Sequence, residues 1–183
     1  YLVDEFHNRI LIYQTPLSTD TTPDKVIGGL SAPRGVAVDA LGNVYASDSE
    51  SDMVREYDTP LVGDTTVDRN YGSGSDGVDC FNSAVPAPTQ TSLACPIDLA
   101  IDRAGNLYVS DSFQGAIFRI ANADTCSPCI ASLVAHDPLL ATAGFPPFGA
   151  NGLAFNGDES ALFIANTGDD RILNVVPYYS FPE

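Results

Sequence analysis

Four copies of one short pattern recur along the chain, and this internal repeat constrains the fold more than any other feature. In each copy an Asp or Asn is followed six residues later by Ile or Val. The four Asx residues are Asp4, Asp48, Asp111 and Asn166. An Asx side chain can accept hydrogen bonds from backbone N–H groups of the turn that follows it. We therefore expect these residues to shape loops rather than to catalyse a reaction.

A second pattern precedes three of the copies and has the form of a β-hairpin. It reads as a short apolar strand, a tight Asp-x-x-Gly-Asn turn and a second β-rich strand. Glycine suits this turn because it adopts positive φ without steric cost. The hairpins cover residues 33–45 and 96–108 and, more loosely, 149–163. Third strands are expected at 9–13, 54–57, 117–120 and 171–175, and fourth strands at 24–28 and around 132–134, with a weaker match at 68–71.

Four antiparallel strands in each unit, with Asx positions 44, 63 and 55 residues apart, predict an all-β protein made of β-propeller blades. We expect one domain over residues 1–183 with about four blades or partial blades. The predicted blades are 1–30 (partial), 33–72, 96–141 and 147–183 (partial), with insertions at 72–95 and 121–146.

A ring of six such blades would need roughly 240 to 270 residues. The chain therefore forms part of a ring, or it makes a smaller or open ring whose strand edges something else must cover. Its first residues, from Tyr1, already belong to a patterned segment. For this reason we expect a piece of a longer chain rather than a chain that has lost a signal peptide.

The units at 33–57 and 96–120 closely resemble the NHL repeat of six-bladed propellers, and the last unit, 151–168, resembles gluconolactonase-type propellers. Both resemblances imply the propeller architecture. They do not imply one role, since NHL-like blades serve many functions.

Gluconolactonase-like enzymes hold a divalent metal with carboxylate and Asn side chains at the mouth of the central channel. Asn151 matches the metal-binding Asn of that family, whose acidic ligand lies in a Pro-Asp-Gly motif. The equivalent positions here read Pro33-Arg34-Gly35 and Pro96-Ile97-Asp98. Asp98 comes one position late, which in a regular strand points its side chain to the opposite face. No counterpart of the family's N-terminal Glu is identifiable, so we expect neither a metal site nor a cofactor.

Other catalytic chemistry has little support in the sequence. Only His7 and His136 could act as a base near neutral pH, and neither lies in a nucleophile motif. The acidic segments 48–52 and 74–79 lack the ligand spacing of a dedicated calcium loop, so we expect them to be solvated surface. We predict no catalytic residue.

All four cysteines fall in the two insertions. They predict two disulfides, Cys80–Cys95 and Cys126–Cys129, and an oxidising compartment. A thioredoxin-type redox pair at Cys126 and Cys129 would need a helix N-terminus, which the sequence does not predict there. A four-cysteine zinc site would need two closely spaced pairs, and Cys80 and Cys95 are too far apart to form one.

The charge of the chain limits its partners. Against 24 acidic residues stand 8 basic ones, and the resulting net charge of -16 disfavours nucleic acid and anionic membranes. No apolar run reaches the roughly 18 residues of a membrane span. Our leading hypothesis is a non-enzymatic module, secreted, on the cell surface or in a periplasm, that binds proteins or glycans. The alternatives are a structural subunit of an extracellular assembly, formed by strand addition between copies, and a lactonase-like hydrolase with Asn151 as its only pointer.

Overall fold

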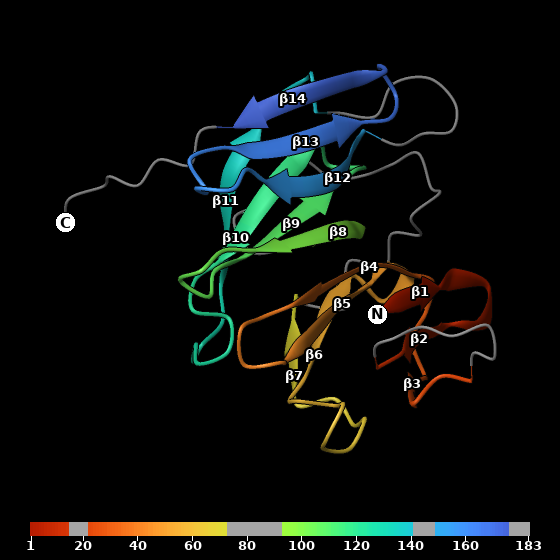
Figure 1. The fold of residues 1–183 in the computed structure, drawn as a ribbon. Coiled ribbons are helices and arrows are strands. Elements are labelled where there is room, and N and C mark those ends of the chain that lie inside the picture. The colour runs from red at the N-terminus through yellow and green to blue at the C-terminus, as the bar shows by residue number, and fades with distance from the viewer. Residues whose placement is uncertain (15–21, 73–92, 141–148, 176–183) are drawn as a thin grey trace.

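The computed structural model describes residues 1–14, 22–72, 93–140 and 149–175, which fold into four antiparallel sheets (Figure 1). The first sheet contains β1 (Leu2–Asp4), β2 (Arg9–Ile12) and β3 (Lys25–Ile27). The second contains β4 (Pro33–Val38), β5 (Val44–Asp48), β6 (Met53–Tyr57) and β7 (Arg69–Tyr71). The third contains β8 (Pro96–Ile101), β9 (Leu107–Asp111), β10 (Ala116–Ile120) and β11 (Ala131–His136), and the fourth contains β12 (Ala150–Phe155), β13 (Leu162–Asn166) and β14 (Arg171–Val175).

The prediction of an all-β fold made of small antiparallel sheets is confirmed. Within each sheet the strands follow one another in chain order, so every sheet is a simple meander. The strand expected on the weaker match at 68–71 is present as β7. Two short 3-10 helices, η1 (Glu5–His7) and η2 (Ser49–Ser51), follow β1 and β5. No helix in the described part of the chain is long and apolar enough to cross a membrane.

Consecutive sheets pack face to face, and the core consists of the apolar layers between them. The first layer brings Ile10, Ile12 and Ile27 against Val44, Ala46 and Tyr57. The second brings Tyr45, Val54 and Tyr71 against Leu99, Val109 and Phe118. The third brings Tyr108 and Ile117 against Leu162, Ile164 and Leu173. Because the inner sheets are covered on both faces, every residue of β5 and of β9 is buried, and these strands lack an exposed polar side.

One charged side chain lies inside the layer between the second and third sheets. Glu56 is fully buried and accepts hydrogen bonds from the hydroxyls of Tyr71 and Tyr45 at 2.5 and 3.2 Å. The guanidinium of Arg69 pairs with the Glu56 carboxylate at 2.7 Å. Burial raises the pKa of Glu56, and the bond from Tyr71 and the charge of Arg69 only partly oppose this rise.

The hairpin turns follow the sequence pattern where it is strict. Gly42 and Gly105 adopt φ of 92° and 79°, and Asp39 accepts hydrogen bonds from the backbone N–H groups of Leu41 and Asn43 at 2.8 and 2.9 Å. In the looser third hairpin the prediction is wrong in detail. There the positive φ falls on Glu159, because this turn is one residue longer.

The Asx residues divide into two groups. Asn166 accepts from the backbone N–H groups of the turn that follows it, as predicted, and so does Asp111. Asp48 and Asp4 do not. The turn after each of them is a 3-10 helix that closes on its own backbone. The Asp48 carboxylate instead accepts from the backbone N–H of Ser31 and pairs with Arg55, and the Asp4 carboxylate bonds to the side chains of His7 and Arg9.

Candidate functional site

The first strands of the second, third and fourth sheets, β4, β8 and β12, lie side by side (Figure 1). In each of them the register of pairing with the next strand shifts near the start of the strand. The shifts fall within 33–36, 96–99 and 150–153, which are equivalent positions of the repeat. A β-bulge of this kind changes the direction of the side chains that it carries.

The three bulges border a cavity of about 440 Å³, called the hub cavity below. Its lining comes from the starts of β4, β8 and β12 and from β1 with its following turn. The lining residues are Val3, Glu5, Pro33, Arg34, Ile97, Asp98 and Asn151.

One expectation about this cavity is wrong. Asp98 lines it together with Asn151, although regular alternation along a strand predicted that Asp98 would face away. The bulge in β8 is the reason. Glu5 also lines the cavity, and no motif identified it. The only available signal was its position directly after the Asx residue of the first repeat.

The electrostatics of the hub cavity depend on Arg34. Its guanidinium lies 3.1 Å from the carboxylate of Glu5, and it stands where gluconolactonase-like enzymes carry a carboxylate. Asp98 accepts a hydrogen bond from the backbone N–H of Leu153 at 2.8 Å, and burial raises the pKa of its carboxyl group. Within the described ranges no three His, Cys, Asp or Glu side chains come together to hold a metal. The cavity combines one fixed cation with carboxylate and amide groups, so it suits a small polar ligand.

Serine side chains join neighbouring sheets next to the bulges. Ser47 accepts a hydrogen bond from the backbone N–H of Gly35 at 2.7 Å and donates one to the carbonyl of Ile97, in the next sheet, also at 2.7 Å. Ser110 repeats this arrangement one sheet later. It accepts a hydrogen bond from the backbone N–H of Asp98 at 3.0 Å and donates one to the backbone carbonyl of Asn151, in the next sheet, at 2.6 Å.

Further serine bonds strengthen the same junctions. Ser49 donates to the carbonyl of Pro96 at 2.6 Å, and Ser112 donates to that of Ala150. The two serines of each Ser-Asp-Ser motif therefore connect one sheet to the next, a role that our sequence reasoning did not assign to them.

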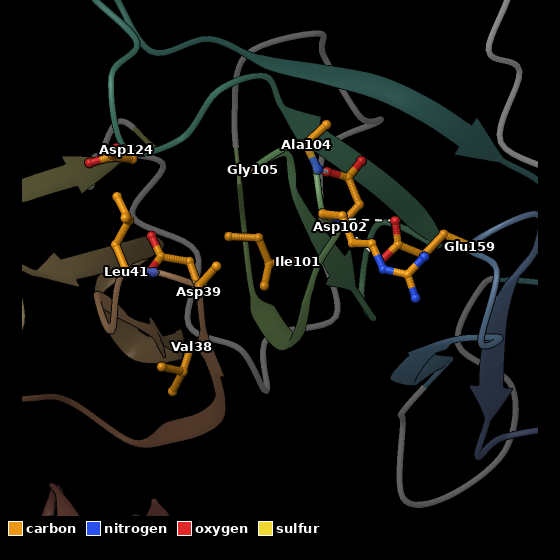
Figure 2. Close-up of a pocket in the computed structure, with 11 residues that line it drawn as sticks. Val38, Asp39, Leu41, Ile101, Asp102, Ala104, Gly105, Asp124 and Glu159 are labelled. Atoms are coloured by element: carbon orange, nitrogen blue, oxygen red, sulfur yellow. Dashed lines mark hydrogen bonds and ion pairs between the residues drawn. The ribbon is translucent and has the colours of Figure 1, made fainter.

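A second cavity, of about 350 Å³, opens between the hairpin turns of the second and third sheets (Figure 2), and we call it the turn-face cleft. Its lining residues are Val38, Asp39, Ala40, Leu41, Ile101, Asp102, Arg103, Ala104, Gly105, Asp124 and Glu159. Leu41 is 67% exposed at its edge, and Ile101 lies between the two turns.

Four carboxylates and one guanidinium surround the turn-face cleft. Asp39 and Asp102 are held in place by the backbone N–H groups of their own turns. Glu159 accepts from the backbone N–H of Arg103 at 3.1 Å and lies 3.5 Å from its guanidinium. Asp124 accepts only a long, 3.4 Å hydrogen bond from a side chain, that of Asn43, among the described residues. The cleft is therefore acidic, with an apolar floor.

The remaining predicted site residues lie elsewhere. His7 bonds to Asp4 at 2.8 Å and His136 is exposed at the end of β11, and neither lines the hub cavity or the turn-face cleft. The expectation that the acidic segment 48–52 is solvated surface is wrong. Asp48 and Asp52, at the two ends of η2, are both buried. The segment 74–79 lies outside the described residues.

A disulfide joins Cys126 to Cys129. Cys95 is buried and disulfide-bonded, while its predicted partner, Cys80, lies outside the described residues.

Comparison with known proteins bears on the fold. No protein-family model matches the chain, and no curated protein matches it. It is similar to a chain in the crystal structure of a nidogen/laminin complex, with a TM-score of 0.54 and 21% identity over 87% of this chain and 50% of that one. The fold is that of a β-propeller.

This chain spans about half the length of the solved propellers that it matches. Two structures of virginiamycin B lyase from Staphylococcus aureus, one of the catalytically inactive H270A form with quinupristin, also match over 82% of this chain and 42% of theirs. Their sequence identity to this chain is 15%, and their TM-scores are 0.43 and 0.45.

Proposed function

We propose that this chain is a non-enzymatic protein-interaction module that binds a cationic, partly apolar segment of a partner protein in the turn-face cleft. The observation that carries the proposal is the set of four carboxylates that line the turn-face cleft, with the exposed Leu41 side chain at its edge. The turn fixes the partly exposed Asp39 before any partner arrives, so little ordering is needed when a Lys or Arg side chain approaches it. The net charge of -16 would steer such a partner toward the protein.

The setting that we propose for this module is an extracellular NHL-type propeller. The units at 33–57 and 96–120 carry the NHL-like pattern, and the oxidised Cys95, Cys126 and Cys129 support an oxidising compartment. The similar solved structure is described as a nidogen/laminin complex, so a propeller of this kind takes part in a protein complex there. That likeness supports protein binding as a class and does not name a partner.

Peptide display tests the proposal. Random peptides panned against the purified chain should be enriched in Lys or Arg next to aliphatic residues. Binding of a selected peptide should weaken about two- to fivefold in Asp124→Asn, the ratio expected for loss of one exposed charge pair. Leu41→Ser should weaken it further through lost apolar contact. Val62→Ser and Asp64→Asn, which remove matching groups from a different exposed loop, should bind like the original chain. Enrichment of acidic peptides would contradict the proposal. So would an equal loss of peptide affinity in the cleft variants, Asp124→Asn and Leu41→Ser, and in the control variants, Asp64→Asn and Val62→Ser.

A second candidate function, lactonase-like hydrolysis, has one observation in its favour. Glu5, Asp98 and Asn151 all line the hub cavity. Arg34 opposes it, because a guanidinium offers only donors and its fixed charge repels a divalent cation at the place where a carboxylate ligand is needed. We expect no opening of gluconolactone in the presence of calcium or manganese. Turnover at an ordinary enzymatic rate that is lost in Asn151→Ala would establish the enzyme instead.

A further inference from the structure

A tyrosine hydroxyl connects the turn-face cleft to the buried Glu56. The hydroxyl oxygen of Tyr45 lies 3.2 Å from Oδ2 of Asp39, which lines the cleft, and 3.2 Å from Oε1 of Glu56. Tyr45 and Glu56 are direct cross-strand partners in β5 and β6, and both are fully buried. The backbone pairing and the packed core therefore hold the hydroxyl between the two carboxyl groups.

This arrangement has more acceptors than protons. A tyrosine hydroxyl carries one proton, and burial raises the pKa of Tyr45, so the proton stays on its oxygen. While Glu56 is ionised, Tyr45 can donate to Asp39 or to Glu56, and the other contact has no donor. A proton on Oε1 of Glu56 removes the shortage, because Glu56 then donates to Tyr45 and Tyr45 donates to Asp39.

Asp39 already has its other donors in place. Oδ1 accepts from the backbone N–H groups of Leu41 and Asn43, and Oδ2 accepts from the Asn43 side chain at 2.9 Å. With Tyr45 as a fourth donor, every lone-pair position of the Asp39 carboxylate is used. The added proton therefore fits on Oε1 of Glu56 and not on Asp39.

Around the other oxygen of Glu56 the donors and acceptors balance. Three protons, one on the Tyr71 hydroxyl and two on Nη1 of Arg69, face three acceptors there. The acceptors are Oε2 of Glu56 and the backbone carbonyls of Ala123 and Asp124. The missing donor is therefore confined to the Oε1 side of the carboxyl group.

The surroundings of Glu56 favour its neutral form. Leu99, Val109 and Phe118 of the third sheet pack against the layer in which it lies, and burial raises the pKa of Glu56. The titratable and charged groups around it come from β5, β7 and the loops at this end of the second and third sheets, and they are Tyr45, Tyr71, Arg69, Asp39, Asp58, Asp68 and Asp124.

We propose that Tyr45 is a pH-dependent switch for the turn-face cleft: its hydroxyl donates to Asp39 while Glu56 is protonated, and to Glu56 after that proton has passed to water. In the second state Asp39 has lost one donor and Glu56 has added a negative charge behind it. Both changes strengthen the attraction of Asp39 for a cation. The consequence for binding rests on the proposed function of the cleft. A cationic segment should bind more tightly as Glu56 ionises, and its binding should release a proton.

The third sheet offers a matched control for this switch. Tyr108 occupies the repeat position of Tyr45 and is also buried, but its cross-strand partner is Arg119 instead of a glutamate. A guanidinium keeps its charge at every pH near neutrality and offers only donors. Tyr108→Phe therefore removes a buried tyrosine hydroxyl without touching a partner that titrates.

Nuclear magnetic resonance of the whole chain tests the switch without a ligand. Tyrosine that is isotope-labelled at the ring carbon bearing the hydroxyl reports the hydrogen bonds of that hydroxyl, and Tyr45→Phe identifies the Tyr45 signal. This signal should shift in one step as the pH is raised, and Glu56→Gln should remove the step. If Glu56→Gln lacks the circular dichroism of the folded chain, labelled glutamate replaces it, and one carboxyl signal should share the midpoint of Tyr45. A Tyr45 signal without the step, or with the same step in Glu56→Gln, overturns the proposal.

Calorimetry with a synthetic peptide of alternating Lys and Leu, at constant ionic strength over a pH series, tests the effect on the cleft. The affinity of the original chain should rise about two- to tenfold across the Tyr45 step, the ratio expected for one hydrogen bond. Glu56→Gln, whose amide can donate to Tyr45 at every pH, should stay at the weak end of this range. Tyr45→Phe, which deprives Asp39 of this donor, should stay at the tight end, and Tyr108→Phe should follow the original chain.

The opposite signs of the two variants separate the switch from simple damage to the fold. Weaker binding in both Glu56→Gln and Tyr45→Phe would overturn the proposal, since general loosening of the layer acts in that direction. A peptide that binds none of these chains would contradict the proposed function of the cleft, and the Tyr45 signal would still decide whether the switch exists.

Discussion

Glycine at position 35 is required by the approach of two backbones, and its replacement gives the sharpest test of the hub geometry. A Cβ added at Gly35 would lie 2.6 Å from the carbonyl oxygen of Ile97 and 2.7 Å from the Cα of Asp98. Both are backbone atoms of β8, so no side chain can rotate away. Restoring an ordinary contact of 3.4 Å would require β4 and β8 to separate by about 0.8 Å at this point.

We expect Gly35→Ala to lower the free energy of unfolding by about 2–4 kcal/mol. Overpacking against fixed atoms accounts for about 1–3 kcal/mol, and weakening of the bond from Ser47 to Ile97 adds about 1 kcal/mol. The melting temperature should fall by about 5–15 °C for a domain of this size. Urea unfolding followed by circular dichroism measures the change, with the denaturant slope compared between variants.

Gly152→Ala is the matched control, because Gly152 occupies the same position of the repeat in β12. There the nearest atoms to an added Cβ are the Cβ of Ala165 at 3.6 Å and a carboxylate oxygen of Asp98 at 3.9 Å, both ordinary contacts. Its stability should stay unchanged or rise by up to about 1 kcal/mol through loss of unfolded-state entropy. If Gly35→Ala were as stable as the original chain, or if both variants lost the same free energy, the close approach would not be the reason for glycine.

Two further predictions concern the junctions between sheets. Ser110→Ala should lower the free energy of unfolding by about 1–3 kcal/mol in thermal unfolding, because it leaves the carbonyl of Asn151 in the next sheet without its donor. Ser160→Ala, in an exposed turn, should lower it less. Equal losses of free energy would show that Ser110 does not join the sheets. Because burial raises the pKa of Glu56, the contribution of this residue to the free energy of unfolding should fall as pH rises from the ordinary value of 4.5 through the raised folded value and then level off. Glu56→Gln should flatten this dependence in urea unfolding at a series of pH values, and an unchanged pH profile would refute the assignment.

The sheets could be predicted from the sequence because each repeat carries its own local signals. The turn before β5 illustrates this, since Asp39, Gly42 and Asn43 specify it within five consecutive residues. Such signals do not depend on what packs nearby, so even the short β7 was found at its weak match.

The hub cavity could not be predicted in the same way, because it is made by neighbours distant in sequence. Asp98 turns into the cavity through a bulge beside Gly35, more than sixty residues earlier, and regular alternation gives the opposite direction. Ser47 and Ile97 are likewise joined only by the packing of two sheets. Glu5 follows a repeat position whose counterparts are serines, so its charge has no parallel in the pattern.

The same consideration explains why one repeat sequence gives different environments at different places in the chain. Tyr108 and Phe163 occupy the same position, with similar shape and equal strand preference, yet among the residues that the structure describes only Tyr108 has a following sheet against it. A small sheet of three or four short strands has little stability by itself, and stacking provides most of its buried area. The burial of any blade residue is therefore a property of the junction rather than of the blade. The difference between Tyr108 at 3% exposure and Phe163 at 39% therefore measures what a neighbouring sheet adds to a residue whose strand, register and shape are otherwise the same.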